Sequence, residues 1–171
     1  MEVFFRWLID RWEALYCAFI VRPYERAVHV RFGKLKRVAG PGWRFRLPFE
    51  IDEIIRINVV PTTSNLGTQV VTDLQGNAFV ISVVIYWRVR EDSVANMALE
   101  LEDHEDVLHD TTYGMLAQVC RESDMTDLRT VERNVATAVR RRLGRYGFDV
   151  MDLWITDISK ARTLRLVTGA E

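Results

Sequence analysis

Alternating apolar and polar positions predict a series of short β-strands after residue 22. The segments Ala27–Phe32 and Trp43–Leu47 both show the two-residue period of a half-buried strand. The turn Gly40–Gly42 between them predicts that they are antiparallel. The same period returns in Asp52–Pro61, and Leu66–Thr72 predicts a further strand. We therefore expect an antiparallel sheet in this part of the chain.

The strongest strand signal lies in Ala78–Val89, which consists almost throughout of β-branched and aromatic residues. It follows the segment Asp73–Asn77, whose Asp, Gly and Asn residues are typical of a tight turn. This nearly continuous apolar run predicts a central strand.

Beyond Asp92 the apolar residues recur every three to four positions, which is the period of a helix. The first predicted helix has Ser93 as its N-cap, and Gly147 ends the last one in the left-handed conformation. The pattern predicts three helices: Ser93–Leu101, His104–Arg121 and Leu128–Tyr146.

A strand is then expected over Phe148–Ile158, and a further helical pattern begins at Ser159. Strands, then helices, then a strand and a helix indicate the α+β class. We predict one domain over residues 22–160, a helix over residues 1–21 before it and a short C-terminal helical tail over residues 161–171.

Large apolar side chains dominate residues 3–21, yet this segment does not fit a simple transmembrane helix. Its charged residues would lie inside the span, at about 2.5–3.5 kcal/mol for each charge near the membrane centre. These residues are Arg6, Asp10, Arg11 and Glu13. The acidic residues and the lack of a small-residue cleavage site also argue against a secretory signal peptide.

On a helical wheel, most charges of residues 1–21 fall in one narrow sector and apolar side chains fill the rest, which predicts an amphipathic helix in an interface. Tryptophan and tyrosine suit the headgroup region of a bilayer. The predicted membrane-contact residues are Phe4, Phe5, Trp7, Leu8, Trp12, Leu15, Tyr16 and Phe19. The same apolar face also fits a protein surface, as a docking helix in an oligomer.

The net charge of −1 hides a strong separation of charge along the chain. Residues 22–46 contain eight basic residues and one acidic residue, a net charge of +7, whereas residues 91–110 contain eight acidic residues and no Lys or Arg. The basic stretch predicts attraction to anionic headgroups or to another subunit, through Arg22, Arg26, Arg31, Lys34, Lys36 and Arg37. Predicted oligomer contacts are Glu102, Asp103, Glu105, Asp106, Arg140, Arg141 and Arg142.

No sequence pattern predicts an enzyme, a metal site or a cofactor. His104 and His109 are five positions apart and lie on different sides of a helix. Cys17 and Cys120 show no metal-ligand or redox spacing, which fits a reducing compartment. The basic cluster Arg140–Arg145 lies at a helix end without interleaved aromatic residues, so nucleic acid is not the expected partner.

Several short segments, in order, resemble the SPFH (stomatin/prohibitin/flotillin, Band 7) domain over about residues 21–160. They are Val21–Lys34, Gly40–Phe49, Ile57–Val59, Val71–Asp73, Arg121–Asp127, Tyr146–Val150 and Ile155–Ile158. The resemblance implies a curved antiparallel sheet with helices packed beside it, membrane attachment at the amino end, assembly into rings or domed enclosures, and no catalytic site.

The expected function is a non-catalytic, membrane-associated scaffold that self-assembles on a membrane patch, with the cytoplasmic face favoured. Anionic lipid, further copies of the chain and membrane-protein clients are the expected partners. The alternative is a structural subunit of a larger protein assembly, viral or secretory, in which the N-terminal helix docks on protein. A nucleic-acid binder is a second rival.

Overall fold

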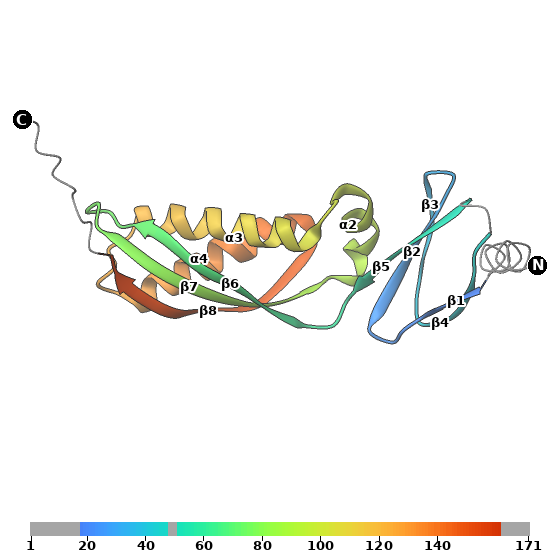
Figure 1. Cartoon of the computed structure of the whole chain (residues 1–171), viewed down its shortest axis with the longest axis horizontal. Coiled ribbons are helices and arrows are strands. Elements are labelled where there is room, and N and C mark those ends of the chain that lie inside the picture. Colours follow the sequence, from blue (N-terminus) through green and yellow to red (C-terminus); the bar gives the residue numbers. More distant parts are fainter. Residues whose placement is uncertain (1–17, 48–50, 162–171) are drawn as a thin grey trace, which may run out of the picture. The chain divides into compact units, whose positions relative to one another are not determined.

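The computed structural model describes residues 18–47 and 51–161 (Figure 1). The described chain forms two compact units. Unit 1 contains the residues up to Val60 together with Arg88–Glu102, and unit 2 contains Pro61–Trp87 together with the residues from Asp103 onwards. The domain expected over residues 22–160 thus comprises two separately packed bodies.

Unit 1 contains a three-stranded antiparallel sheet with β2 (Glu25–Arg31) between β3 (Lys34–Ala39) and β5 (Asp52–Asn58). A separate ribbon pairs β1 (Ala18–Val21) with β4 (Gly42–Phe45). The sequence predicted β2 and β4 as antiparallel strands, but β2 pairs with β3 and β5. Strand β3 was not predicted, because all of its residues except Ala39 are exposed and leave no two-residue period of burial.

Two elements pack against the three-stranded sheet. On one face, Phe19 and Val21 of β1 pack with Ala27, Ala39 and Ile54. The short helix α2 (Val94–Glu100), preceded by the 3-10 turn η1 (Glu91–Ser93), packs against the strands with its buried residues Val94 and Met97. The predicted Ser93 cap is not made: no backbone N–H of α2 donates to the Ser93 hydroxyl, which accepts from Arg90 and donates to Asp92.

The N-terminal helix predicted to reach residue 21 does not include Ala18–Val21, which form strand β1. These residues gain backbone pairing with β4, where Ile20 lies opposite Trp43, and Val21 is buried in the core. The predicted helix over residues 1–17 lies outside the described residues.

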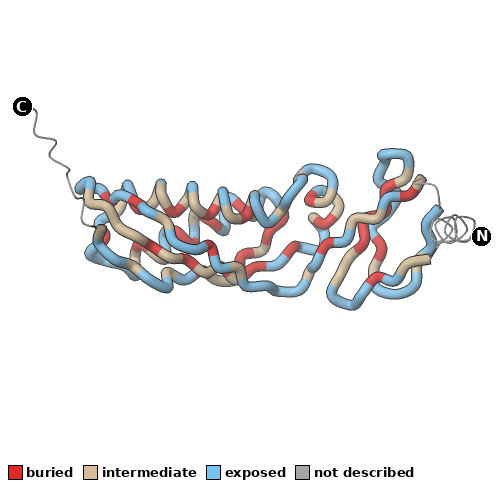
Figure 2. The backbone as a smooth tube through the Cα atoms, viewed as in Figure 1, coloured by how far each residue is buried: buried red, intermediate tan, exposed pale blue. Residues whose placement is uncertain are grey.

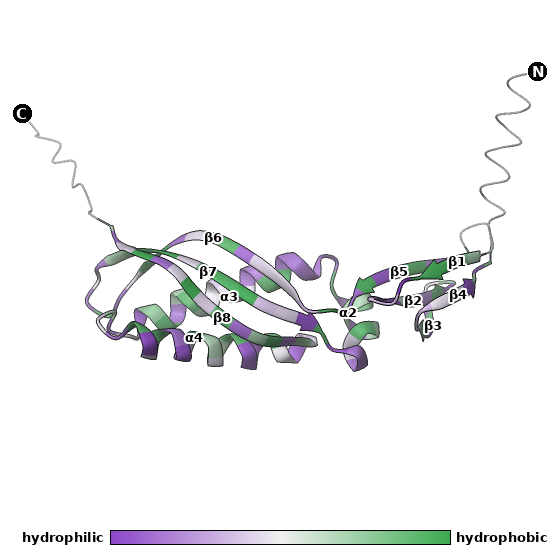
Figure 3. Ribbon diagram, turned by 90° about the horizontal axis from the view of Figure 1, so that it is seen from below, coloured by the Kyte–Doolittle hydropathy of each residue, from purple (hydrophilic) through white to green (hydrophobic). Residues whose placement is uncertain are grey.

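Unit 2 contains the sheet β6–β7–β8, formed by β6 (Thr62–Thr72), β7 (Ala78–Val89) and β8 (Phe148–Lys160). The prediction of a central strand at residues 78–89 is confirmed. Helices α3 (His104–Arg121) and α4 (Leu128–Leu143) lie on the same face of this sheet (Figure 1, Figure 3). Buried positions alternate along β7, which Figure 2 shows as alternating colours: Ile81, Val83, Ile85 and Trp87.

The ends of the helices follow from local side chains. Asp103 accepts hydrogen bonds from the backbone N–H groups of Glu105 and Asp106, and Asp127 accepts one from Thr130. A 3-10 turn, η2 (Gly144–Tyr146), continues α4, and Gly147 follows with a φ of 96°. Its left-handed conformation confirms the predicted stop.

The α+β class with antiparallel sheets is confirmed. The helix predicted to begin at Ser159 is wrong at its start, because Ser159 and Lys160 extend β8. The Ala161 N–H also donates to the carbonyl of Ala78, the first residue of β7, so pairing with β7 holds the chain extended here. The tail over residues 162–171 lies outside the described residues.

We predict that Phe148→Ala lowers the free energy of unfolding by about 3–5 kcal/mol, because it removes a buried ring and leaves a cavity. Phe148 is fully buried, and its ring meets that of Trp87 edge to face at 5.4 Å between centroids. Urea unfolding measures the change. The control is Val70→Ala on exposed Val70 of β6, which should change stability by about 0.5 kcal/mol or less. Equal effects of the two substitutions would contradict this core.

Candidate functional site

Several chain segments meet at one end of unit 1. The backbone N–H of Phe32, in the β2–β3 turn, donates to the carbonyl of Ile51 at 3.1 Å. The N–H of Leu47, just after β4, donates to Asp52 Oδ2 at 2.7 Å. Ala18, the first residue of β1, lies opposite Phe45. This end therefore contains the β2–β3 turn, the end of β4 and the start of β1. We call it the aromatic end, after Phe32, Trp43 and Phe45.

The carboxylate of Asp52 joins these segments. Its side chain is buried and accepts two hydrogen bonds from Arg31, from Nε at 2.6 Å and Nη2 at 2.9 Å. The bonds from Arg31 are the largest cause that lowers the pKa of Asp52 below its ordinary value of 3.8, against the opposing effect of burial. The N–H of Leu47 adds to the lowering. Asp52 is therefore held as a carboxylate that ties β2, β4 and β5 together.

His29 completes this buried cluster. Its Nε2 lies 2.8 Å from Asp52 Oδ2, at an angle outside hydrogen-bond geometry, and its Nδ1 has no partner among the described residues. The whole residue is buried under the β1–β4 ribbon side of the sheet, opposite Ile54. The cluster thus fixes the position of the aromatic end with charged and polar groups rather than with apolar packing.

Three aromatic side chains project from this region into solvent. Phe32 is 76% exposed, Phe45 72% and Trp43 69%. In the β1–β4 ribbon, Trp43 lies opposite Ile20 and Phe45 opposite Ala18, so these residues share one face. Alternation turns Phe19 and Val21 to the other face, where they join the core. The ribbon therefore carries apolar side chains on both faces, and Trp43 and Phe45 on one of them are exposed in the described part of unit 1.

Phe32 is held in a strained conformation. It has a φ of +49° and precedes Gly33 at +71°, in the two-residue turn between Arg31 and Lys34 (Figure 2 shows this turn exposed). Such a turn favours Asn-Gly, and a left-handed residue other than glycine costs about 1–3 kcal/mol. The exposed Phe32 ring does not offset this cost by packing in unit 1.

The predicted headgroup contacts divide into two groups. Three are used within unit 1: Arg22 donates to the Tyr24 hydroxyl, Arg26 pairs with Glu91 at 2.8 Å, and Arg31 binds Asp52. The other three are exposed on β3 and make no side-chain hydrogen bond within the described residues. They are Lys34, Lys36 and Arg37. These cations follow directly on Phe32 and give the aromatic end a positive border.

The predicted oligomer contacts divide in the same way. Asp103 caps α3, and Arg140 donates to the carbonyls of Val150 and Met151 at 3.0 and 2.7 Å. Both are therefore engaged within unit 2. The remaining predicted contacts are exposed: Glu102, Glu105, Asp106, Arg141 and Arg142.

The predicted membrane-contact residues lie mostly outside the described residues: Phe4, Phe5, Trp7, Leu8, Trp12, Leu15 and Tyr16. Phe19 is described, and it lies in β1 and packs, partly buried, against the small core rather than on a helix. Sequence reasoning missed Phe32 and Phe45 as exposed positions. The alternation of apolar and polar residues predicted that Trp43 and Phe45 lie on the same face of a strand. It did not indicate whether that face is buried or exposed.

The described residues contain no group of three His, Cys, Asp or Glu side chains that could hold a metal ion. Cys120 is fully buried, and burial raises the pKa of its thiol to about 11, which makes it a poor nucleophile. His104 packs against Trp87, and His109 against Tyr113.

None of the helices in the described ranges is long and apolar enough to cross a membrane. What the described surface offers is an exposed aromatic end with a basic border.

Residues 19–165 match the model of the SPFH domain / Band 7 family, and the chain belongs to this family. The match covers both compact units and begins within β1. The family as a whole is membrane-associated and of a scaffold type that is generally non-catalytic, and its members typically self-assemble.

We predict that Asp52→Asn lowers the free energy of unfolding by about 3 kcal/mol at neutral pH, because it leaves Arg31 and His29 without their carboxylate. The pKa of Asp52 is lower in the folded than in the unfolded chain. The carboxylate therefore makes its full contribution to stability above pH 3.8, and this contribution declines progressively as the pH falls from 3.8 towards and through the folded-state pKa.

Urea unfolding between neutral pH and about pH 3 measures this difference, and the gap between wild type and variant should narrow at the acid end. Exposed Glu53, the next residue in β5, provides the control. Glu53→Gln should change stability by about 0.5 kcal/mol or less. A gap that stays constant down to the lowest pH would count against the role of Asp52.

Proposed function

We propose that this chain is a membrane-associated scaffold subunit whose aromatic end contacts the bilayer. The observation that carries the proposal is the exposure of Phe32, Trp43 and Phe45 at the end of unit 1 where the chain enters β1. The amphipathic helix predicted for the preceding residues would act at the same place, because Ala18 lies opposite Phe45.

Energies support a weak contact for each subunit. Full burial of a phenylalanine side chain is worth about 1.5–3 kcal/mol, and a cation near an anionic surface adds about 1 kcal/mol. Lys34, Lys36 and Arg37 supply such cations. Immobilisation on the surface opposes these gains. Subunits joined in one assembly would bind far more tightly, since each further contact becomes intramolecular.

Self-assembly into rings or cage-like oligomers is the second part of the proposal. The acidic stretch over residues 91–110 and the arginines of α4 lie on different parts of the chain, so a contact between them is head-to-tail and can close into a ring. Anionic headgroups are abundant on the cytoplasmic leaflet, which favours that face of the membrane.

The alternative is that the aromatic end docks on a protein in a larger assembly. An exposed aromatic ridge suits a protein groove as well as a lipid surface. The basic border at Lys34 and Lys36 favours the anionic membrane. Binding to protein-free vesicles separates the two functions.

We predict that Trp43→Ser together with Phe45→Ser weakens binding to phosphatidylcholine vesicles containing phosphatidylserine by about tenfold or more, because two rings no longer enter the interface. Vesicle flotation measures the bound fraction. The matched control is Val70→Ser with Leu74→Ser, two exposed apolar residues of unit 2, which should leave binding unchanged.

A deletion of residues 1–17 tests the predicted helix. The deletion must not extend further, because removal of Ala18–Val21 would destroy β1 and its core contacts. Flotation should fall further when this deletion is combined with the ribbon substitutions. Unchanged flotation of the ribbon variant would refute the proposed membrane contact of the aromatic end. Failure of the full-length chain to float would favour the protein-docking alternative.

A further inference from the structure

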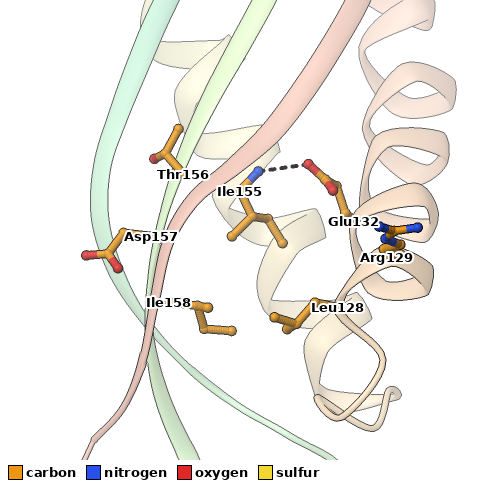
Figure 4. A pocket seen from close by; sticks show the side chains of 7 residues that line it. All are labelled: Leu128, Arg129, Glu132, Ile155, Thr156, Asp157 and Ile158. Atoms are coloured by element: carbon orange, nitrogen blue, oxygen red, sulfur yellow. Dashed lines mark hydrogen bonds between the residues drawn. The ribbon is translucent and has the colours of Figure 1, made fainter.

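A groove runs between α4 and β8 in unit 2. One part, of about 310 Å³, is a hollow in which the apolar side chains of Leu128, Ile155 and Ile158 face one another (Figure 4). Four polar residues complete its lining: Arg129, Glu132, Thr156 and Asp157. A second part, of about 320 Å³, is lined by Arg133, Asp152 and Trp154 among others. Arg129 and Glu132 line both parts, which therefore lie next to each other between α4 and β8.

Most charges along this groove are already engaged. Glu132 accepts a hydrogen bond from the backbone N–H of Ile155 at 3.1 Å (Figure 4), and Arg140 donates to carbonyls at the start of β8. Asp152 lies 3.7 Å from Arg140. These contacts cover the outer edge of β8, which would otherwise offer unpaired backbone groups.

Two arginines and one carboxylate, that of exposed Asp157, remain along the groove. Arg129 and Arg133 are exposed, lie one helical turn apart and make no side-chain hydrogen bond or ion pair among the described residues. The interaction that is seen for the Arg133 side chain is an electrostatic attraction to the nearby Asp127 carboxylate. Trp154, 42% exposed, lines the same groove. The surface therefore combines two available cations, one carboxylate, an aromatic ring and a hollow lined in part by apolar side chains.

An acidic surface of matching spacing lies on α3. Asp106 and Asp110 are exposed, lie one helical turn apart and form no side-chain hydrogen bond or ion pair within residues 18–47 and 51–161. They cannot meet the arginines of their own chain. His104, at the start of α3, contacts Trp87 near the end of β7, whereas the hollow at Ile158 lies near the start of β7, where Ala161 bonds Ala78.

We propose that the α4–β8 groove receives the first turns of α3 from a second copy of the chain, with Asp106 and Asp110 paired to Arg129 and Arg133. The acidic and basic surfaces are different parts of unit 2, and in the head-to-tail contact we propose each copy keeps one of its two surfaces open for the next subunit. This inference rests on the self-assembly in the proposed function and assigns its interface.

Charge reversal tests the interface in the full-length chain. Arg129→Glu with Arg133→Glu should weaken self-association about tenfold, because two attractions become repulsions. Asp106→Lys with Asp110→Lys should weaken it equally. The combination of all four substitutions restores opposite charges at every contact and should restore assembly. Sedimentation velocity at low salt measures the size distribution of the assemblies. High salt should reduce the assembly of the wild type and the fourfold variant, and it should have little effect on the variants that no longer assemble.

Two controls separate a specific contact from a change in net charge or folding. Arg121→Glu with Arg145→Glu changes the same number of exposed arginines outside the groove and should leave assembly unchanged. Arg129→Lys with Arg133→Lys keeps the charge and should also preserve it. In this lysine variant, carbodiimide should join the substituted positions to Asp106 or Asp110 of another copy, as peptide mapping of the dimer band would show.

Recovery in the fourfold variant together with these cross-links would support the interface. If assembly is unaffected by the arginine reversal, the proposed interface is wrong. This outcome would also be seen if the groove binds nucleic acid rather than a second copy. Failure of the fourfold variant to recover would also overturn it. Flotation of the same variants on vesicles tests the membrane contact separately, so a chain that floats but ignores the reversals would refute this inference alone.

Discussion

The structure of the aromatic end depends on one buried carboxylate. Asp52 begins β5, yet its oxygens are bonded by Arg31 from β2 and by the N–H of Leu47 beyond β4. Apolar packing supplies little of this order, because the core next to it is small and consists largely of Val21, Ala27 and Ala39. A charged group bonded from several sides fixes direction as well as distance, which a few small apolar side chains do not. The exposed rings therefore keep a defined arrangement without being packed themselves.

This arrangement explains why unit 1 tolerates features that oppose its own stability. A left-handed phenylalanine and a ribbon face with exposed Trp43 and Phe45 both lower the stability or solubility of an isolated chain. Natural proteins often keep such features where a surface has a function. A bilayer would cover the rings and offset their exposure, and the strained turn holds Phe32 outward beside Lys34. Unit 2 contains no comparable strained residue among those described: its positive φ values belong to glycine.

The sequence predicted the parts of the fold in which burial and local period agree. The β7 strand, α3 and the stop at Gly147 follow from apolar spacing and from local side chains, and all three were predicted correctly. Strand β3 was not predicted, because it is an exposed edge strand that is held in place by its backbone pairing with β2. The Asp52 cluster was not predicted for a related reason. Its members occupy polar positions of two strands, where the sequence pattern is that of ordinary solvated residues: His29, Arg31 and Asp52. Only the fold brings them together, and only the fold shows which cations remain available.

Separate compact units carry the two proposed surfaces, and this division has a physical consequence. A scaffold must bind lipid weakly enough for single subunits to exchange, yet hold firmly once assembled. If one surface served both contacts, lipid would compete with the neighbouring subunit for the same side chains. Here the rings Phe32, Trp43 and Phe45 belong to unit 1, and the α4–β8 groove belongs to unit 2. The two proposed contacts therefore use different side chains, so lipid and a neighbouring subunit would not compete for them.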